Sequence, residues 1–230
     1  MQKKYIRLFM SIFLLTAMYF LAKEAAVYTN SLSGQTEQEM TVVIDVGHGG
    51  KDPGKVGVNG ELEKDINLAI ALKLQSFLQQ SDVTVVMTRC EDVGLYDEDA
   101  GNKKVQDMRC RIELIETSGA DLVVSIHQNS YRDSSVRGPQ CFYYGDSLEG
   151  EHAALILQEQ LNSGLEIERP RKAKANSSYY LLKKSVIPTV IAECGFLSNG
   201  EEAVLLTNEK YQEKVAWNLY LGILEYFNTN

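Results

Sequence analysis

The sequence predicts a single α/β domain built on a twisted, mostly parallel sheet with helices on both faces. Short apolar runs such as TVVIDV alternate along the chain with longer segments whose apolar residues recur at helical spacing. Nearly continuous apolar runs are typical of strands buried on both faces, and their alternation with helices predicts βαβ units with right-handed crossovers. The roughly 200 residues beyond the N-terminal segment suffice for one core. The order of the strands does not follow from this pattern.

The first half of the domain alternates strands, loops and helices. Residues 47–60 hold six Gly and one Pro and must form a loop. Ile66, Ile70 and Leu74 recur on one face of the helix that follows. The predicted elements are a strand at 41–46, the loop at 47–60, a helix at 65–80, a strand at 83–88, a polar loop at 89–102 and a helix near 104–118.

The second half continues the same alternation. The expected elements are a strand at 121–127, an edge strand at 139–145, a helix at 152–162, a buried strand at 188–193 and a closing helix from about Tyr211 to Tyr226. Val215, Leu219 and Ile223 mark the apolar stripe of that last helix.

Residues 1–26 are predicted to be a signal peptide or an N-terminal membrane anchor. Lys3, Lys4 and Arg7 precede an apolar run of 15 residues that ends at Ala22. That length is the upper limit of a signal-peptide core and short for a spanning helix of ~20 residues. Both alternatives send the body across a membrane and leave the positive charge inside. A polar linker is expected at 27–40 and the folded domain at 41–230.

Charge and cysteine usage exclude some classes of function. Beyond residue 23 the chain has 19 Lys and Arg against 31 Asp and Glu, a formal charge of −12. Nucleic acid is not an expected partner, because phosphate binding relies on Lys and Arg. The four cysteines form no CxxC pair, which disfavours a four-cysteine zinc site. They are expected to be small core residues, with at most one disulfide.

Four residues far apart in the sequence have the composition of a catalytic zinc site. His48 lies in GHGG just beyond the first strand, Glu63 at the mouth of the first helix, and His127 at the end of an apolar strand. Two imidazoles and one carboxylate hold Zn²⁺ and leave a position open for water. Glu193, at the end of another strand, is placed to take the proton of that water. In an open α/β sheet this edge is where ligands bind.

Each of the four also has a structural explanation. His48 is alternatively a turn histidine, Glu63 a favourable charge at a helix N-terminus, and His127 a hydrogen-bonded core histidine. Glu193 is alternatively the partner of an arginine, since a buried carboxylate is costly unless it is paired or near a metal. Spacing alone also leaves Glu61 open as a ligand in place of Glu63.

Neighbouring polar residues suggest secondary roles. Asp45 is expected to accept the second ring N–H of His48 and fix its tautomer. Asn129 is a candidate for binding substrate amides or, alternatively, for capping the turn. Asp65 is the expected helix N-cap, and His152 is expected to be a surface residue rather than a ligand.

These segments resemble the zinc N-acetylmuramoyl-L-alanine amidases of the amidase-3 family. The resemblance runs from about Thr41 to Phe227 and includes DVGHGGKDPG, ELEKDINLAIALKL, VVMTR, DLVVSIHQNS and VIAECGFLSN. It implies a zinc hydrolase that cleaves the amide between the muramic acid lactyl group and L-alanine of peptidoglycan. It also implies Zn²⁺ bound by His48, Glu63 and His127 and makes 41–230 the catalytic domain.

The same resemblance assigns further roles. It implies that Glu193 is the catalytic acid and base, and it places Arg111 on a family arginine near the pocket, as a candidate for substrate binding. The family glutamate precedes a Lys-Asp pair, which favours Glu63 over Glu61. Val46 stands where relatives often have Pro.

Within the family, three segments resemble the germination-specific amidases of the spore cortex: QCFYYG, SYYLLKKSVIPTVIAECGFLSN and KYQEKVAWNLYLGILEYF. In that group the enzyme strips the peptide from muramic acid, which a deacetylase then converts to muramic-δ-lactam. The implied setting is the outer face of a bacterial membrane, in the forespore or cortex space. Because no separate wall-binding domain is recognised, a tethering or activating protein partner is expected besides the peptidoglycan substrate.

Two other functions are weighed against this one. A zinc carboxypeptidase also uses a His/Glu/His site on an α/β sheet, but it usually has a tight H-x-x-E pair, whereas His48 and Glu63 are 15 residues apart. A membrane-tethered wall-binding module without catalysis explains export and a polar pocket. It does not explain the presence of both Glu63 and Glu193.

Overall fold

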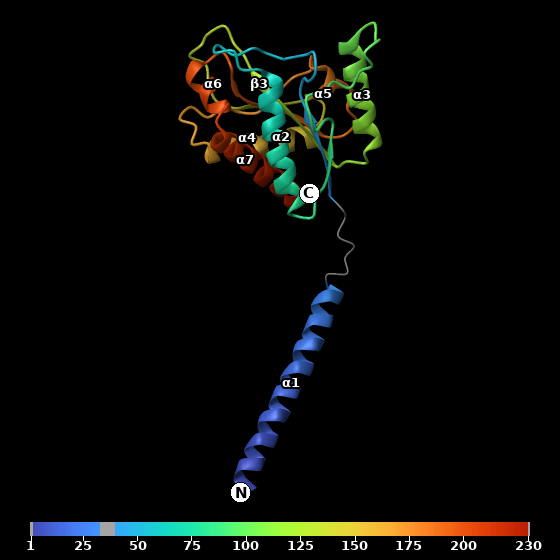
Figure 1. Ribbon diagram of the computed structural model, residues 1–230, viewed down its shortest axis with the longest axis vertical. Helices are drawn as coiled ribbons and strands as arrows, with labels where there is room; N and C mark the ends of the chain where they lie inside the picture. Colours follow the sequence, from blue (N-terminus) through green and yellow to red (C-terminus); the bar gives the residue numbers. More distant parts are fainter. Residues whose placement is uncertain (1, 33–39, 230) are drawn as a thin grey trace. The chain divides into compact units, whose positions relative to one another are not determined.

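The computed structural model describes residues 2–32 and 40–229, which belong to two compact units divided after Glu39 (Figure 1). The first unit contains one helix, α1, Gln2–Leu32. This helix continues through 27–32, where the sequence predicted linker, because no Gly or Pro interrupts it there. The rest of that predicted linker, 33–39, lies outside the described residues. Among the residues described, no helix has both the length and the apolar character needed to cross a bilayer.

The second unit contains six strands and six helices among its described residues. The strands are β1 (Thr41–Val46), β2 (Thr84–Met87), β3 (Leu122–Asn129), β4 (Gln140–Tyr143), β5 (Lys174–Ala175) and β6 (Thr189–Phe196). The helices are α2 (Glu63–Gln79), α3 (Lys103–Thr117), α4 (Leu148–Gly164), α5 (Tyr180–Lys184), α6 (Gly200–Leu206) and α7 (Glu209–Thr229).

The strands form one mostly parallel sheet in the order β2-β1-β3-β6-β4-β5, as the fold class predicted. β1 pairs in parallel with β2 and β3, and β3 pairs in parallel with β6, whereas β4 runs antiparallel to β6. The prediction of an edge strand at 139–145 was wrong, because the two-residue strand β5 pairs with the outer side of β4. β5 is too short to produce a recognisable pattern in the sequence.

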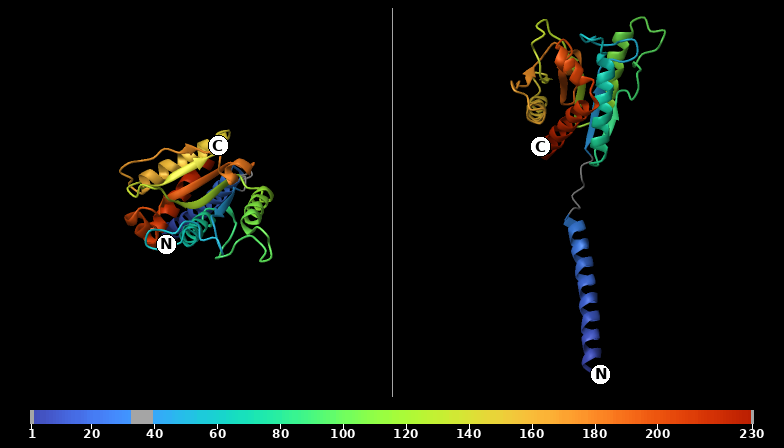
Figure 2. Two further views of the ribbon diagram at one scale, coloured as in Figure 1. Left: turned by 90° about the horizontal axis from the view of Figure 1, so that it is seen from above. Right: turned by 60° about the vertical axis from the view of Figure 1, so that its left-hand side comes forward.

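Alternate residues of the strands face two cores of unequal size. On one face Val42, Ile44 and Val46 of β1 belong to the larger core, which also includes residues of α2, α4 and α7, and α7 packs between α2 and α4 (Figure 2). On the other face Val43 and Val123 pack against the smaller helices α3 and α5. The predicted arrangement of helices on both faces is therefore confirmed, and the thinly covered face is the one on which the site lies.

The helix boundaries differ slightly from those predicted because local hydrogen bonds set them. α3, α4 and α6 begin at side-chain caps, Asn102, Ser147 and Asn199. α2 begins instead at Glu63, with Leu62 as an N-cap that offers no side-chain bond, so the prediction of Asp65 as the cap was wrong.

All four cysteines are free thiols. Cys141 and Cys194 are buried in the larger core, as expected for packing residues, whereas Cys90 is exposed and Cys110 is partly buried. The sequence allowed for one disulfide, and none forms.

Candidate active site

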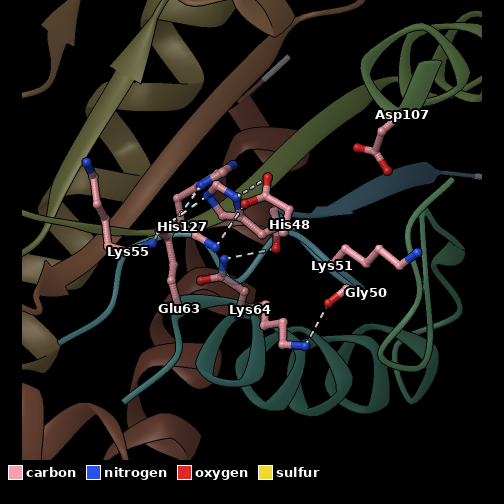
Figure 3. Close-up of polar contacts among 12 residues, drawn as sticks. His48, Gly50, Lys51, Lys55, Glu63, Lys64, Asp107 and His127 are labelled. Carbon is pink, nitrogen blue, oxygen red and sulfur yellow. Dashed lines mark hydrogen bonds and ion pairs between the residues drawn. The ribbon is translucent and has the colours of Figure 1, made fainter. Parts of the chain in front are cut away.

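Three side chains from three separate elements converge at the carboxyl edge of the sheet (Figure 3). His48 follows β1, Glu63 is the first residue of α2, and His127 lies near the end of β3. One possible ligand atom from each lies within 4.8 Å of the other two. The structure thus brings together the set of ligands that the sequence predicted. Glu61 lies apart and accepts hydrogen bonds from Asn59.

The carboxylate of Glu63 bridges the two imidazoles. Its Oε1 lies 2.9 Å from His127 Nδ1 and its Oε2 lies 3.2 Å from His48 Nε2. Ligand atoms of one tetrahedral zinc are roughly 3–4 Å apart, because each bond is about 2 Å long. The backbone N–H groups of Lys55 and Gln128 also donate to Glu63, at 2.7 and 3.0 Å, and fix the carboxylate in place.

Glycines allow the backbone to approach these side chains closely. His48 has φ 61°, in the left-handed region that ordinary side chains rarely adopt. A Cβ at Gly47 would lie 2.4 Å from the ring of His127, and one at Gly54 would lie 2.6 Å from Glu63 Oε2. The Gly-rich loop is therefore required by the packing of the site itself.

The charges of the cluster favour a bound cation. Burial alone would raise the pKa of Glu63, but the hydrogen bonds and charges of His127 and His48 hold it well below its ordinary value. Burial opposes the charged form of His48, yet hydrogen bonds and negative charge from Glu63 and Asp52 raise the pKa of its ring. Glu63 is therefore a carboxylate, and the imidazoles face net negative charge.

Asp52, which the sequence analysis missed, orients His48. Its Oδ2 lies 2.9 Å from His48 Nδ1, the ring nitrogen opposite the one that faces Glu63. The prediction of Asp45 for this role was wrong, because the Asp45 carboxylate accepts from Arg111 and Ser125 on the α3 side of the sheet. The available signal was a carboxylate four residues after His48 in the same loop.

Glu193 lies beside His127 through the register of the sheet. The two residues are direct partners in the parallel pair β3–β6, so their side chains share a face. Glu193 is only 8% exposed, and its Oε2 is buried without a hydrogen-bond partner. Burial raises its pKa to about 7, with His127 opposing and Glu63 adding to the shift. Among the described residues no arginine forms a salt bridge with Glu193, and a buried oxygen without a partner suits a group that awaits a ligand or water.

Arg111 and Asn129 already have partners within the protein. Arg111 is 2% exposed and donates to Asp45, Asp107 and the carbonyls of Val46 and His48. Asn129 Oδ1 accepts from the N–H of Ser130, in line with the turn-capping alternative. Substrate binding by either residue stays a prediction.

Arg89 is a second buried arginine that the sequence analysis missed. It is 3% exposed and donates to the carbonyls of Val46, Gly47, Lys64 and Glu91. Its only signal in the sequence is its place directly after an apolar strand. His152, as predicted, lies away from this site, beside Thr229 of α7.

A cavity of about 460 Å³ opens beside the cluster on the α3 side. His48, His127 and Glu193 line it together with residues of α3 and α5. A cavity of this size accommodates a small part of a substrate next to the three candidate ligands.

Comparison with known proteins identifies the family. The family model of the N-acetylmuramoyl-L-alanine amidases matches residues 42–225. The chain belongs to this family. The two other functions weighed from the sequence, a zinc carboxypeptidase and a wall-binding module without catalysis, are thereby excluded.

Individual relatives agree with this assignment. The germination-specific N-acetylmuramoyl-L-alanine amidase of Bacillus subtilis is 42% identical over 189 residues, which cover 81% of this chain and 79% of that protein. The CwlD amidase of Clostridioides difficile, solved in complex with the GerS lipoprotein, has a TM-score of 0.81 and 40% identity over 83% of this chain and 100% of its own. The catalytic domain of the amidase CwlV from Bacillus (Paenibacillus) polymyxa var. colistinus has a TM-score of 0.73 and 31% identity, covering 83% and 99% of the two chains.

Proposed function

We propose that this amidase is zinc-dependent and cleaves the bond between the lactyl carbonyl of muramic acid and L-alanine in peptidoglycan, with His48, Glu63 and His127 as the metal ligands. The convergence of two imidazoles and one carboxylate within 4.8 Å carries the proposal. The buried, unpartnered oxygen of Glu193 beside them supports the fit, because a group held next to a metal and its water needs no protein partner.

When bound, zinc supplies a Lewis acid that polarises a carbonyl and lowers the pKa of a water molecule toward ~7. Glu193 then acts as general base and general acid. Its carboxylate accepts a proton from the attacking water and returns it to the nitrogen of the leaving L-alanine. The raised pKa of Glu193 in the metal-free protein suits a group that must both take up and release a proton near neutral pH. Asp52 holds His48 in one tautomer through Nδ1.

The biological setting we infer is the spore cortex, where the reaction would be the first step toward muramic-δ-lactam. This inference rests on the likeness to the germination-specific relative. Deletion of the gene should leave cortex peptidoglycan without the lactam. Lactam at the normal level in the deletion strain would contradict this setting.

We further propose that residues 1–26 direct the domain across the membrane, as a cleaved signal or an anchor. The three bases before the apolar run carry this inference. N-terminal sequencing of the mature protein from membrane and soluble fractions tests it, and finding the full chain in the cytosol alone would contradict it.

A lipoprotein partner is proposed by analogy with the complex of the Clostridioides difficile relative, and co-purification from sporulating cells tests that analogy.

The experiment that tests the activity is mass spectrometry of purified peptidoglycan incubated with the zinc-loaded full chain. Release of peptides with a free N-terminal alanine is expected from the wild type and not from Glu193→Gln. The variant should retain one zinc per chain, because Glu193 is not among the proposed ligands. Normal turnover by Glu193→Gln would remove its assigned role, and protein without zinc that still releases these peptides would contradict the metal dependence.

A further inference from the structure

Tyr179 lies on the same face of the sheet as the candidate active site. The register pairs Phe142 of β4 with Ile191 of β6, and Glu193 follows Ile191 by two residues. Side chains two residues apart in a strand share a face at a spacing of about 7 Å, so Phe142 and Ile191 form the row next to Glu193. The ring of Tyr179 packs edge-to-face on Phe142, with the ring centroids 5.5 Å apart. Tyr179 accordingly lines the same cavity as His127 and Glu193.

Local contacts fix the position of Tyr179 at the start of α5. The side-chain oxygen of Asn176 accepts from the backbone N–H groups of Ser178 and Tyr179, at 2.8 and 3.1 Å, and closes the turn that leads into this helix. Leu181 of α5 is buried and anchors the helix on the smaller core. Because the turn holds its backbone and Phe142 holds its ring, Tyr179 loses little freedom when a substrate binds.

The hydroxyl of Tyr179 is available as a hydrogen-bond donor. Within the described part of the chain, no residue forms a hydrogen bond with it. Burial raises the pKa of Tyr179, and the charges of Glu193 and Glu63 add to the shift, so both carboxyl groups lie within electrostatic reach of the hydroxyl. A tyrosine hydroxyl is protonated at neutral pH even at its ordinary pKa of about 10. The side chain therefore presents a neutral donor beside the two acids of the site.

The proposed reaction creates an oxygen that requires such a donor. As water adds to the lactyl carbonyl, the carbonyl oxygen gains negative charge. Glu63 is a carboxylate, and Glu193 keeps the proton that it receives for the leaving nitrogen, so neither donates to this oxygen. The cations that line the cavity are already matched by acids: Lys51 and Lys103 by Glu98, Lys104 by Asp52, and Arg111 by Asp45 and Asp107. A fixed neutral donor near a developing oxyanion is worth more in a partly dry site than in water.

We propose that Tyr179 is a further catalytic residue of this amidase, whose hydroxyl donates a hydrogen bond to the lactyl carbonyl oxygen as negative charge develops on it. The proposal rests on the function proposed above and adds one residue to it. Tyr179 keeps its own proton, so the proton still passes from water to Glu193 and from Glu193 to the leaving nitrogen. Because the hydrogen bond is strongest when the oxygen is charged, Tyr179 contributes to kcat more than to KM.

The test is Tyr179→Phe, which removes the hydroxyl and keeps the ring that packs on Phe142. The full chain, zinc-loaded and in detergent, is assayed for release of peptides with a free N-terminal alanine from soluble peptidoglycan fragments. We expect kcat to fall at least about tenfold and KM to change less than about twofold, because only the charged oxygen loses its donor. Zinc content and melting temperature should equal those of the wild type.

Tyr143→Phe is the matched control. Tyr143 follows Phe142 directly and therefore points to the opposite face of β4, where its hydroxyl donates to Glu151 of α4 at 2.7 Å. This variant also loses one tyrosine hydroxyl, but away from the cavity, and it should keep the kcat and KM of the wild type.

A second measurement does not depend on turnover. In a phosphinate analogue of the substrate, a tetrahedral phosphorus with a negatively charged oxygen replaces the scissile carbonyl. Calorimetry should show that Tyr179→Phe binds this analogue at least about tenfold more weakly than the wild type does. The uncleaved fragments, measured with Glu193→Gln in both proteins, should bind equally well with and without the hydroxyl.

The outcomes separate this proposal from the proposed function. Equal kcat in the wild type and Tyr179→Phe would overturn the role of Tyr179 while the amidase function stands. An equal loss of affinity for the phosphinate and for the uncleaved fragments would also overturn it, because the hydroxyl would then bind the substrate as such. If the wild type releases no alanine, the proposed function fails. Phosphinate binding then decides on Tyr179: weaker binding by Tyr179→Phe supports its role, and equal binding or none contradicts it.

Discussion

The ring of His127 lies against the backbone at Gly47 so closely that no side chain fits there. We predict that Gly47→Ala displaces the imidazole, because the new Cβ would lie 2.4 Å from it. The expected result is a loss of about 1–3 kcal/mol of stability and at least about tenfold weaker zinc binding. Chelator competition measures the second quantity. Gly101→Ala is the control, because a Cβ there meets nothing within 4 Å, and equal zinc affinity in both variants would contradict the prediction.

Glu193 makes the stability of the zinc-free protein depend on pH. Burial raises the pKa of Glu193 in the folded protein to about 7 from an ordinary 4.5. The free energy of unfolding that this shift contributes is therefore complete below about pH 4.5, and it is lost as the pH rises through 7. Glu193→Gln lacks this titration. The wild type should therefore lose about 3 kcal/mol relative to the variant between pH 4.5 and pH 8, a difference that urea unfolding in chelator measures. A pH-independent difference would mean that Glu193 titrates normally.

At the scale of elements, two buried arginines fix the turn that presents His48. Arg89 donates to the carbonyls of Val46 and Gly47, and Arg111 donates to those of Val46 and His48. The carbonyls of the last residue of β1 and of the two residues after it are thereby held while His48 adopts its positive φ. Arg89 lies in the loop after β2 and Arg111 lies in α3, yet both donate to the carbonyl of Val46 and each donates to one of the next two carbonyls. Together with the bond from Gly47 N–H to the carbonyl of Ile126 in β3, these contacts hold the turn in shape.

We predict that Arg89→Lys destabilises the fold by about 1.5–3 kcal/mol, because an ammonium cannot reproduce the planar fork of donors. Zinc affinity should fall as well, since the His48 turn loosens. Arg109→Lys, an exposed change on α3, should stay within about 0.5 kcal/mol. Thermal unfolding and chelator competition on both variants test this, and a neutral Arg89→Lys would show that the turn needs no such support.

The elements most visible in the sequence were those that a single pattern determines. The apolar run 41–46 predicted β1 with its observed bounds. The ends of two other apolar runs placed His127 and Glu193 at the carboxyl edge of the sheet, where the structure has them. α5 and α6, with five and seven residues, are shorter than a helical period can reveal and were not predicted. The role of Asp45 was mistaken because its partner Arg111 is 66 residues away, and only the packing of α3 on the sheet brings the two together.

At the scale of the whole molecule, the site joins the two faces of the sheet. Glu63 begins α2, which packs in the larger core, whereas His127 and Glu193 project on the face covered by α3 and α5. The carboxylate of Glu63 crosses the edge of the sheet to reach both histidines. A metal held by these three residues therefore connects both layers of the domain. Its binding should raise the free energy of unfolding of the entire domain.

Zinc should accordingly raise the melting temperature of the folded domain. A ligand that binds only the native state at about 100 times its Kd stabilises it by about 2.7 kcal/mol, which corresponds to about 5–10 °C for a domain of this size. Glu63→Gln should abolish this shift, because the amide lacks the negative charge that the two imidazoles and the cation share. Glu61→Gln is the matched control, since Glu61 lies two residues away and its carboxylate accepts hydrogen bonds from Asn59 of the same loop. Calorimetry of each protein with zinc and with chelator separates the metal effect from the intrinsic stability of each variant. A shift that persists in Glu63→Gln and vanishes in Glu61→Gln would assign the ligand to the other glutamate.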